Sequence, residues 1–85
     1  MKHAGPAALA ALGGLLAEIR REEGVVERRP GIFYRKGRAL LHFHEDPSGL
    51  HADLRRTDTF ERFRVESAAE RRAFLAMLRQ ALRRA

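Results

Sequence analysis

The sequence has 85 residues, of which 45% are hydrophobic and 33% are charged, and it contains no cysteine. This length allows one domain with a thin core and excludes a second domain within the sequence, while the lack of cysteine excludes disulfides and thiolate metal sites. The formal net charge of +6 favours an anionic partner. The charge can equally reflect the composition of the source, because all but two of the 17 basic residues are arginine.

A first helix is expected over residues 6–23. Pro6 suits its first turn, and Gly24 is a natural left-handed end. Gly13 and Gly14 lower the helix propensity and therefore indicate close approach to another element. The apolar residues recur at intervals of three and four, which places them on one helical face; they are Leu9, Leu12, Leu16 and Ile19.

The apolar run at residues 7–17 imitates the core of a secretory signal. It leads without a break into residues 18–23, all of which are charged except Ile19. It is also shorter than the roughly 20 residues that a membrane span needs. We therefore expect neither a secretory signal nor a membrane partner, and the lack of cysteine makes a reducing cytoplasm the simplest compartment.

The middle of the chain is expected to form four strands joined by turns. Residues 25–29 are interpreted as a partly extended connector, and Pro30 disfavours a helix there. The strands are expected at about 31–35, 38–45, 49–56 and 59–65. The turns contain Lys36-Gly37, which suits a two-residue hairpin, Asp46-Pro47-Ser48-Gly49, which suits a type I turn, and the polar pair Thr57-Asp58.

A second helix is expected after Ser67, which forms a capping box with Glu70. Apolar residues follow at helical spacing as far as Leu82. Two amphipathic helices can cover one face of an antiparallel sheet and leave the other face open. We therefore predict a single α+β domain over residues 1–85: a helix, a four-stranded antiparallel meander and a helix, with both helices on one face of the sheet.

The three turns set the register of the predicted sheet, because a slip of one residue would reverse every side chain. One face becomes apolar, with the pairs Ile32 with Leu41, Leu41 with Leu54, Phe43 with Ala52, Ala52 with Phe63, and Leu50 with Val65. Only Glu61, opposite Leu54, interrupts this face.

The opposite face is basic, rich in histidine and partly aromatic. Its pairs are Phe33 with Leu40, Leu40 with Arg55, Arg55 with Phe60, His42 with Asp53, Asp53 with Arg62, His44 with His51, and His51 with Arg64. Asp53 is therefore expected to lie between His42 and Arg62.

The first half of the chain carries a second pattern. A helix leads into Gly24-Val25, a proline precedes the first strand, and Tyr34-Arg35-Lys36-Gly37-Arg38-Ala39 crosses the first turn before an apolar strand. Residues 15–55 thus resemble the small bacterial MmcQ/YjbR family. The resemblance implies an α+β fold, and DNA binding has been suggested for that family. His42, His44 and the segment 46–49 do not map onto the family pattern.

The basic face indicates a small non-enzymatic module that binds nucleic acid or another polyanion. Its arginines carry fixed charge, its histidines add charge on protonation, and its phenylalanines offer stacking surfaces for bases. The predicted binding residues are His42, His44, His51, Arg55, Arg62, Arg64, Phe33 and Phe60.

Other interpretations of the same face stay open. Phe33, Leu40 and Phe60 can form the interface of a homodimer. The histidines, together with Asp53, can bind zinc or a similar ion, although the neighbouring arginines would place positive charges beside it, or they are ordinary solvated residues. Neither catalysis nor a cofactor is predicted, because the sequence contains no catalytic signature and its hydroxyl residues belong to turns and a helix cap.

Overall fold

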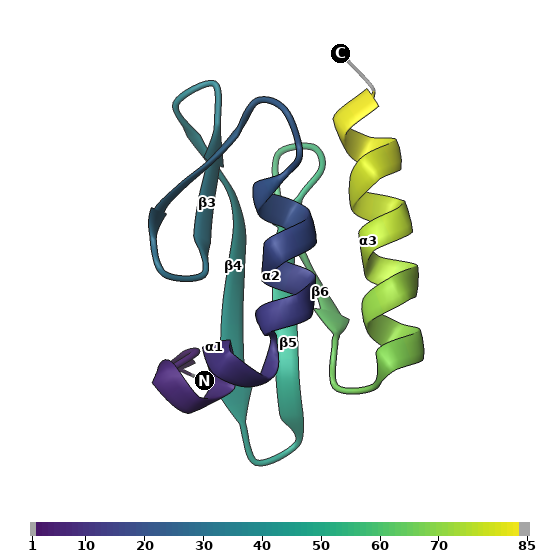
Figure 1. Ribbon diagram of the computed structural model, residues 1–85. Coiled ribbons are helices and arrows are strands. Elements are labelled where there is room, and N and C mark those ends of the chain that lie inside the picture. The colour runs from purple at the N-terminus through teal and green to yellow at the C-terminus, as the bar shows by residue number, and fades with distance from the viewer. Residues whose placement is uncertain (1, 84–85) are drawn as a thin grey trace.

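Within residues 2–83, which the computed structural model describes, six strands form one antiparallel sheet and three helices accompany it (Figure 1). The elements are β1 (Lys2–His3), α1 (Pro6–Ala11), α2 (Gly13–Arg20), β2 (Val25–Arg29), β3 (Ile32–Arg35), β4 (Arg38–Asp46), β5 (Gly49–Arg55), β6 (Phe60–Arg64) and α3 (Ala68–Arg83). The strand order is β2-β3-β4-β5-β6, and β1 pairs with β4 outside this path. The predicted α+β class is confirmed. The predicted meander corresponds to β3 through β6, and it is incomplete because β1 and β2 extend the sheet.

The two longer helices, α2 and α3, lie next to each other over the same face of the sheet (Figure 1). Their apolar side chains join those of the strands in one core. The most deeply buried large side chains are Leu12, Ile19, Phe33, Leu41, Phe43, Leu54, Val65 and Leu78. Because this face is covered, the surfaces available for binding are the other face and the ends of the sheet.

The predicted first helix is divided at Leu12, where φ is −87° and ψ is 5°. Helical hydrogen bonds continue on both sides of the break, from Leu12 N to Ala8 O at 3.0 Å and from Leu16 N to Leu12 O at 2.9 Å. The close approach predicted at Gly13 and Gly14 is wrong, since a Cβ on either glycine would meet no atom within 4 Å. Their low helix propensity coincides with the break itself.

The pairing of β4, β5 and β6 follows the register predicted from the turns. The core pairs are Leu41 with Leu54, Phe43 with Ala52, and Ala52 with Phe63. The β4–β5 turn has the expected chemistry, because Asp46 Oδ1 accepts a hydrogen bond from Ser48 N at 2.8 Å. The capping box is also formed: Glu70 N donates to Ser67 Oγ at 3.0 Å, and Ser67 N donates to Glu70 Oε1 at 2.8 Å.

The register predicted between β3 and β4 is wrong by one residue beyond the turn. The expected two-residue turn forms, with positive φ at both of its central residues. Leu40 is then left out of the ladder, so that Phe33 pairs with Leu41 and Ile32 pairs with His42. Such a β-bulge reverses which side chains face the core. Phe33 is therefore completely buried and does not lie on the open face, and Leu40 is buried as well.

The segment predicted as a connector is strand β2, which pairs with β3. Gly31 turns the chain between the two strands with φ of 76°. Glu27 Oε2 accepts a hydrogen bond from Gly31 N at 2.9 Å, and Glu27 also forms an ion pair with Arg20 at 2.6 Å. These contacts tie the β2–β3 turn to α2.

Strand β1 has no counterpart in the prediction. β4 has nine residues whereas β3 has four, so β3 leaves the last part of β4 with a free edge. β1 fills this edge by pairing Lys2 with Glu45 and His3 with His44. The Glu45 carboxylate then accepts a hydrogen bond from Gly5 N at 2.6 Å. The edge strand brings a fourth histidine to the sheet.

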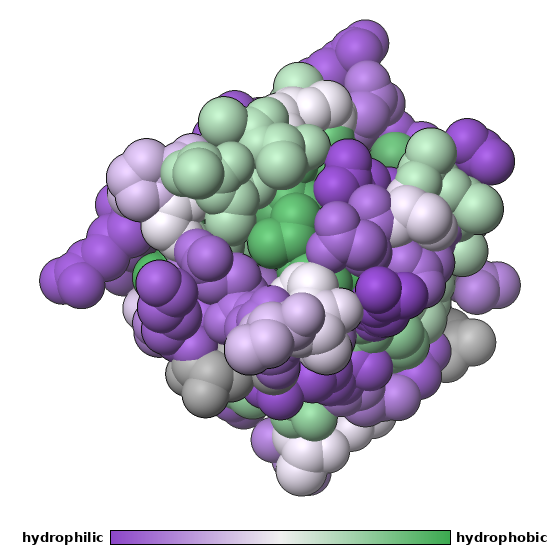
Figure 2. Space-filling model, turned by 90° about the horizontal axis from the view of Figure 1, so that it is seen from below, coloured by the Kyte–Doolittle hydropathy of each residue, from purple (hydrophilic) through white to green (hydrophobic). Residues whose placement is uncertain are grey.

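The surface of the described residues is largely polar. Among the large apolar side chains, Val26 and Phe60 are the exposed ones, at 55% and 39%. The view from below Figure 1 shows apolar colour in separate patches and at the bottom of a hollow, surrounded by hydrophilic side chains (Figure 2). No helix within residues 2–83 is long and apolar enough to cross a membrane.

Candidate binding site on the open face of the sheet

The open face, the side of the sheet turned away from α2 and α3, presents most of the predicted binding residues. The predicted pairs found there are His42 with Asp53, Asp53 with Arg62, His44 with His51, His51 with Arg64, and Arg55 with Phe60. The strands supply these residues because successive side chains point to opposite faces. Phe33 is not among them, because the bulge turns it into the core.

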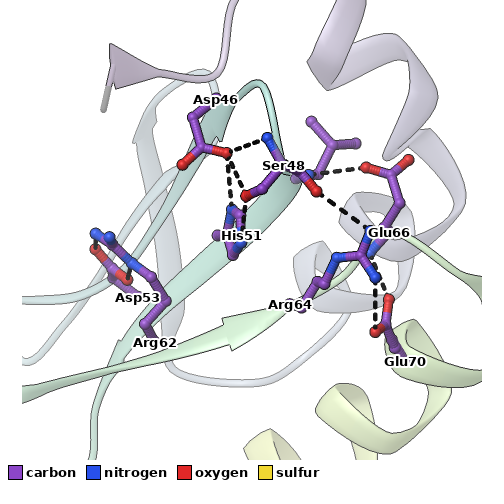
Figure 3. Close-up of polar contacts among 9 residues, drawn as sticks. Asp46, Ser48, His51, Asp53, Arg62, Arg64, Glu66 and Glu70 are labelled. Atoms are coloured by element: carbon purple, nitrogen blue, oxygen red, sulfur yellow. Dashed lines mark hydrogen bonds and ion pairs between the residues drawn. The ribbon is translucent and has the colours of Figure 1, made fainter.

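Asp53 is the acidic centre of the open face. Arg62 donates two hydrogen bonds to its carboxylate, from Nε at 2.8 Å and from Nη2 at 2.7 Å (Figure 3). These bonds are the main reason why the pKa of Asp53 lies below its usual value. His44 Nε2 lies 3.3 Å from Asp53 Oδ2. The imidazole beside Asp53 is thus the diagonal His44 rather than the directly opposite His42, the neighbour predicted from the sequence.

The side chain of His51, a residue of β5, contacts the β4–β5 turn rather than the centre of the open face. Its Nε2 lies 3.5 Å from Ser48 Oγ, and its Nδ1 lies 4.0 Å from Asp46 Oδ1 (Figure 3). Arg64 reaches the same turn, since Nη2 donates to Ser48 O at 3.2 Å and Nη1 lies 3.6 Å from Glu70 Oε2. Both side chains therefore contact the turn, and Arg64 also links it to the start of α3.

Arg55 is oriented by the bulge in β4. Its Nε and Nη2 both donate to Ala39 O, at 2.9 and 2.5 Å. Its guanidinium carbon lies 5.0 Å from the centroid of the Phe60 ring. The centroid of the His42 ring lies 4.8 Å from the Phe60 centroid. A carbonyl partner fixes the arginine without cancelling its charge. Arg55 and Phe60 are therefore presented together at the surface.

The two histidines of β4 are mainly neutral at pH 7. Burial is the largest cause of the lowered pKa of His42, and the charges of His44 and His3 lower it further. Burial is also the largest cause of the lowered pKa of His44. A pKa below the ordinary 6.5 leaves an imidazole uncharged at neutral pH. These rings are therefore neutral hydrogen-bonding or metal-ligating groups, whereas the sequence suggested added positive charge.

His3 completes a cluster that the sequence does not indicate. Its ring centroid lies 4.7 Å from that of His44 and 5.8 Å from that of His42. One ring nitrogen from each of the three lies within 4.8 Å of the others. A two-residue strand has no periodicity from which it could be recognised. The one signal in the sequence is that the strand predicted for β4 is longer than its first partner, which leaves an edge for another segment.

A second group of cations lies where β3 turns into β4 and β5 turns into β6. This group, here called the basic end, comprises Arg35, Lys36, Arg38, Arg55 and Arg56. Three of its arginines line a cavity of about 390 Å³ against α3. Arg35 Nη2 donates to Leu82 O at 3.0 Å, and Arg56 makes two hydrogen bonds of 2.7 Å to the Glu61 carboxylate. The sequence prediction included Arg55 but not the other four residues, because Lys36 and Arg56 lie in turns and Arg35 and Arg38 lie at the ends of strands.

No protein-family model, no curated protein and no solved structure matches the chain. The resemblance of residues 15–55 to the MmcQ/YjbR family therefore stays a prediction. Function has to be inferred from the side chains that the sheet brings together.

Proposed function

We propose that the protein is a small non-enzymatic module that binds nucleic acid through the phosphate backbone, with the basic end as the main contact. The uneven distribution of charge along the sheet carries this proposal. Residues 35–39 and 55–61, which form the basic end, include five basic and two acidic residues. Residues 2–5, 44–50 and 64–70, at the opposite end, include two basic and four acidic residues. A polyanion is therefore attracted to one end of the sheet rather than to the whole surface.

Four of the five basic residues of the basic end keep their charge available, whereas Arg56 is paired with Glu61 at 2.7 Å. Arg35 and Arg55 are held by backbone carbonyl oxygens, which orient the guanidinium groups without neutralising them. Lys36 and Arg38 are exposed at the β3–β4 turn. A guanidinium fork matches the oxygens of a phosphate. Phe60, with 39% of its surface exposed, lies beside Arg55 and offers a face on which an unpaired base can stack.

Other residues predicted to bind are less suited to the main contact. Arg62 has Asp53 as a carboxylate partner, and Arg64 has Glu70. The histidines of β4 carry little charge at neutral pH because their pKa values are lowered. We therefore place these side chains at the border of the contact, adjoining Arg55 and Phe60.

Self-association is one of the alternatives that the sequence offers for the open face. Of its three apolar residues, Phe33 and Leu40 are buried in the core, and Phe60 alone is exposed. One exposed ring is a small part of the apolar area that a stable dimer buries. Nucleic-acid binding is therefore better supported than self-association. A cytoplasmic location stays a prediction.

Fluorescence anisotropy with a labelled single-stranded oligonucleotide tests the proposal. We expect binding at low salt that weakens steeply as the salt concentration rises, because phosphate contacts release counterions. Arg38→Glu reverses one charge at the basic end and is expected to weaken binding by roughly tenfold or more at low salt.

The matched control is Arg72→Glu, which makes the same change at an exposed position in the first half of α3, away from the basic end. This variant is expected to bind almost as tightly as the wild type. A lack of anisotropy change at low salt would refute nucleic-acid binding. Equal losses in the two variants would refute the assignment to the basic end.

A further inference from the structure

We propose that His3, His42 and His44 form a binding site for a divalent transition-metal ion, and that the expected ion is zinc. The site lies on the open face and shares no residue with the basic end, so it goes beyond nucleic-acid binding and does not depend on it. The alternation of side chains along β4 puts His42 and His44 on the same side of the sheet. β1 pairs with the free edge of β4 and places His3 opposite His44.

The three imidazoles are close enough to share one ion. One ring nitrogen of each lies within 4.8 Å of the other two. Tetrahedral zinc with Zn–N bonds of about 2.0–2.1 Å needs nitrogens about 3.3 Å apart, so each pair has to approach by no more than about 1.5 Å. His3 is exposed and can make most of this movement by rotating about its side-chain bonds.

Asp53 prepares His44 as a ligand. His44 Nε2 lies 3.3 Å from Asp53 Oδ2, and two hydrogen bonds from Arg62 hold the carboxylate in place. A carboxylate beside one imidazole nitrogen keeps the proton there and leaves the other nitrogen to bind a metal. His44 Nδ1 is buried and has no hydrogen-bond partner among the described residues. Coordination of an ion would satisfy this nitrogen.

Two of the three arginines near the histidines have other partners. Arg62 is paired with Asp53 at 2.7 Å, and Arg64 is directed to the β4–β5 turn and the start of α3. An ion at the cluster therefore faces one uncompensated arginine, Arg55, whose guanidinium contacts the Phe60 ring beside His42.

The donor set indicates which ions bind. Three imidazole nitrogens suit Zn²⁺, Ni²⁺ and Cu²⁺, whereas Mg²⁺ and Ca²⁺ prefer oxygen ligands. Three neutral ligands also leave one position of a tetrahedral ion free for water or a small anion. The expected ligand is thus a zinc-like ion with an exchangeable fourth partner.

Isothermal titration calorimetry of the full chain, without a histidine tag, tests the site. We expect one zinc ion per chain and no heat of binding from magnesium chloride. His3→Gln removes the exposed ligand and is expected to weaken zinc binding at least about tenfold. His42→Gln provides a second ligand variant, and circular dichroism establishes that each variant is folded.

The matched control is His51→Gln, which removes the remaining histidine of the sheet but leaves the cluster intact. It is expected to bind zinc as tightly as the wild type. If the folded wild type binds no zinc, the three rings are ordinary surface histidines. The proposal would also be overturned if His51→Gln lost as much affinity as His3→Gln. Because nucleic acid is absent from these titrations, their outcome is independent of the proposed function.

Discussion

Among single residues, Asp53 does most to determine the character of the open face. It pairs with Arg62 at 2.7 Å, lies 3.3 Å from His44, and has 13% of its side chain exposed. Its carboxylate compensates the charge of one neighbour and orients the ring of the other. Because two hydrogen bonds form to a single guanidinium, this pair has more favourable geometry than an ordinary surface ion pair.

Asp53→Asn is expected to lower the free energy of unfolding at pH 7 by about 1–2 kcal/mol, because a charged hydrogen-bond acceptor is lost. The pKa of Asp53 is lower in the folded protein than its ordinary value. The ionised carboxylate therefore stabilises the fold fully above the unfolded pKa of about 3.9, and this effect is lost as the pH falls through the folded pKa. Urea unfolding of the wild type and of Asp53→Asn at pH 7 and at pH 3 measures the difference in their free energies of unfolding. A difference that does not narrow at pH 3 would contradict the role given to Asp53.

Among the elements, β4 shows what could be predicted and what could not. Its pairing with β5 follows from the sequence because the Asp46 turn fixes one end and apolar alternation through Phe43 fixes the buried face. The bulge at Leu40 does not follow, because Ile32 and Phe33 are both apolar and either one suits the core. Which of Ile32 and Phe33 faces the core depends on packing against the helices. The apolar pattern of one strand does not contain that information.

The same distinction applies to the candidate site. Alternation along β4 places His42 and His44 on one face, and the sequence is sufficient for that prediction. His3 joins them only because a two-residue strand pairs with an edge that β3 leaves free. That pairing depends on the lengths of strands in the folded sheet and on the contact of Glu45 with Gly5.

Glu45→Ala is expected to loosen β1 without unfolding the sheet. The Glu45 carboxylate accepts the Gly5 N–H, next to Ala4, whose own N–H donates to Phe43 O at 2.9 Å. Loss of a hydrogen bond to a charged acceptor costs about 1.5–3 kcal/mol, so the Ala4 amide should exchange with solvent at least about tenfold faster. Hydrogen exchange followed by NMR measures this rate.

Glu66→Ala is the matched control for β1, because Glu66 also accepts a backbone hydrogen bond, from Leu50 N at 2.9 Å. It is expected to accelerate exchange at Leu50 and to leave Ala4 unchanged. Acceleration of Ala4 to the same degree in both variants would mean that β1 opens only with the whole sheet.

In the whole molecule, we assign different roles to the covered face and the open face of the sheet. The covered face supplies stability through apolar contacts, such as those of Phe74. Its ring centroid lies 5.7 Å from that of Phe63 and 6.4 Å from that of Phe43. The open face and the basic end carry the charges and histidines proposed to bind ligands. Arg79 joins the two helices on the covered side by hydrogen bonds to Glu22 at 2.9 Å and to Glu18 at 3.0 Å.

This division predicts that apolar burial, and not the ion pairs between the helices, holds α3 in place. Phe74→Ala removes a nearly completely buried ring and is expected to lower the free energy of unfolding by about 3–5 kcal/mol, which is a large share of the roughly 5–15 kcal/mol typical of a domain. Arg79→Ala is expected to have a much smaller effect, because its side chain is 39% exposed and its charge is screened by solvent. Urea unfolding followed by circular dichroism compares the two. Comparable losses would show that the ion pairs contribute as much as the core, and the two faces could then no longer be assigned separate tasks.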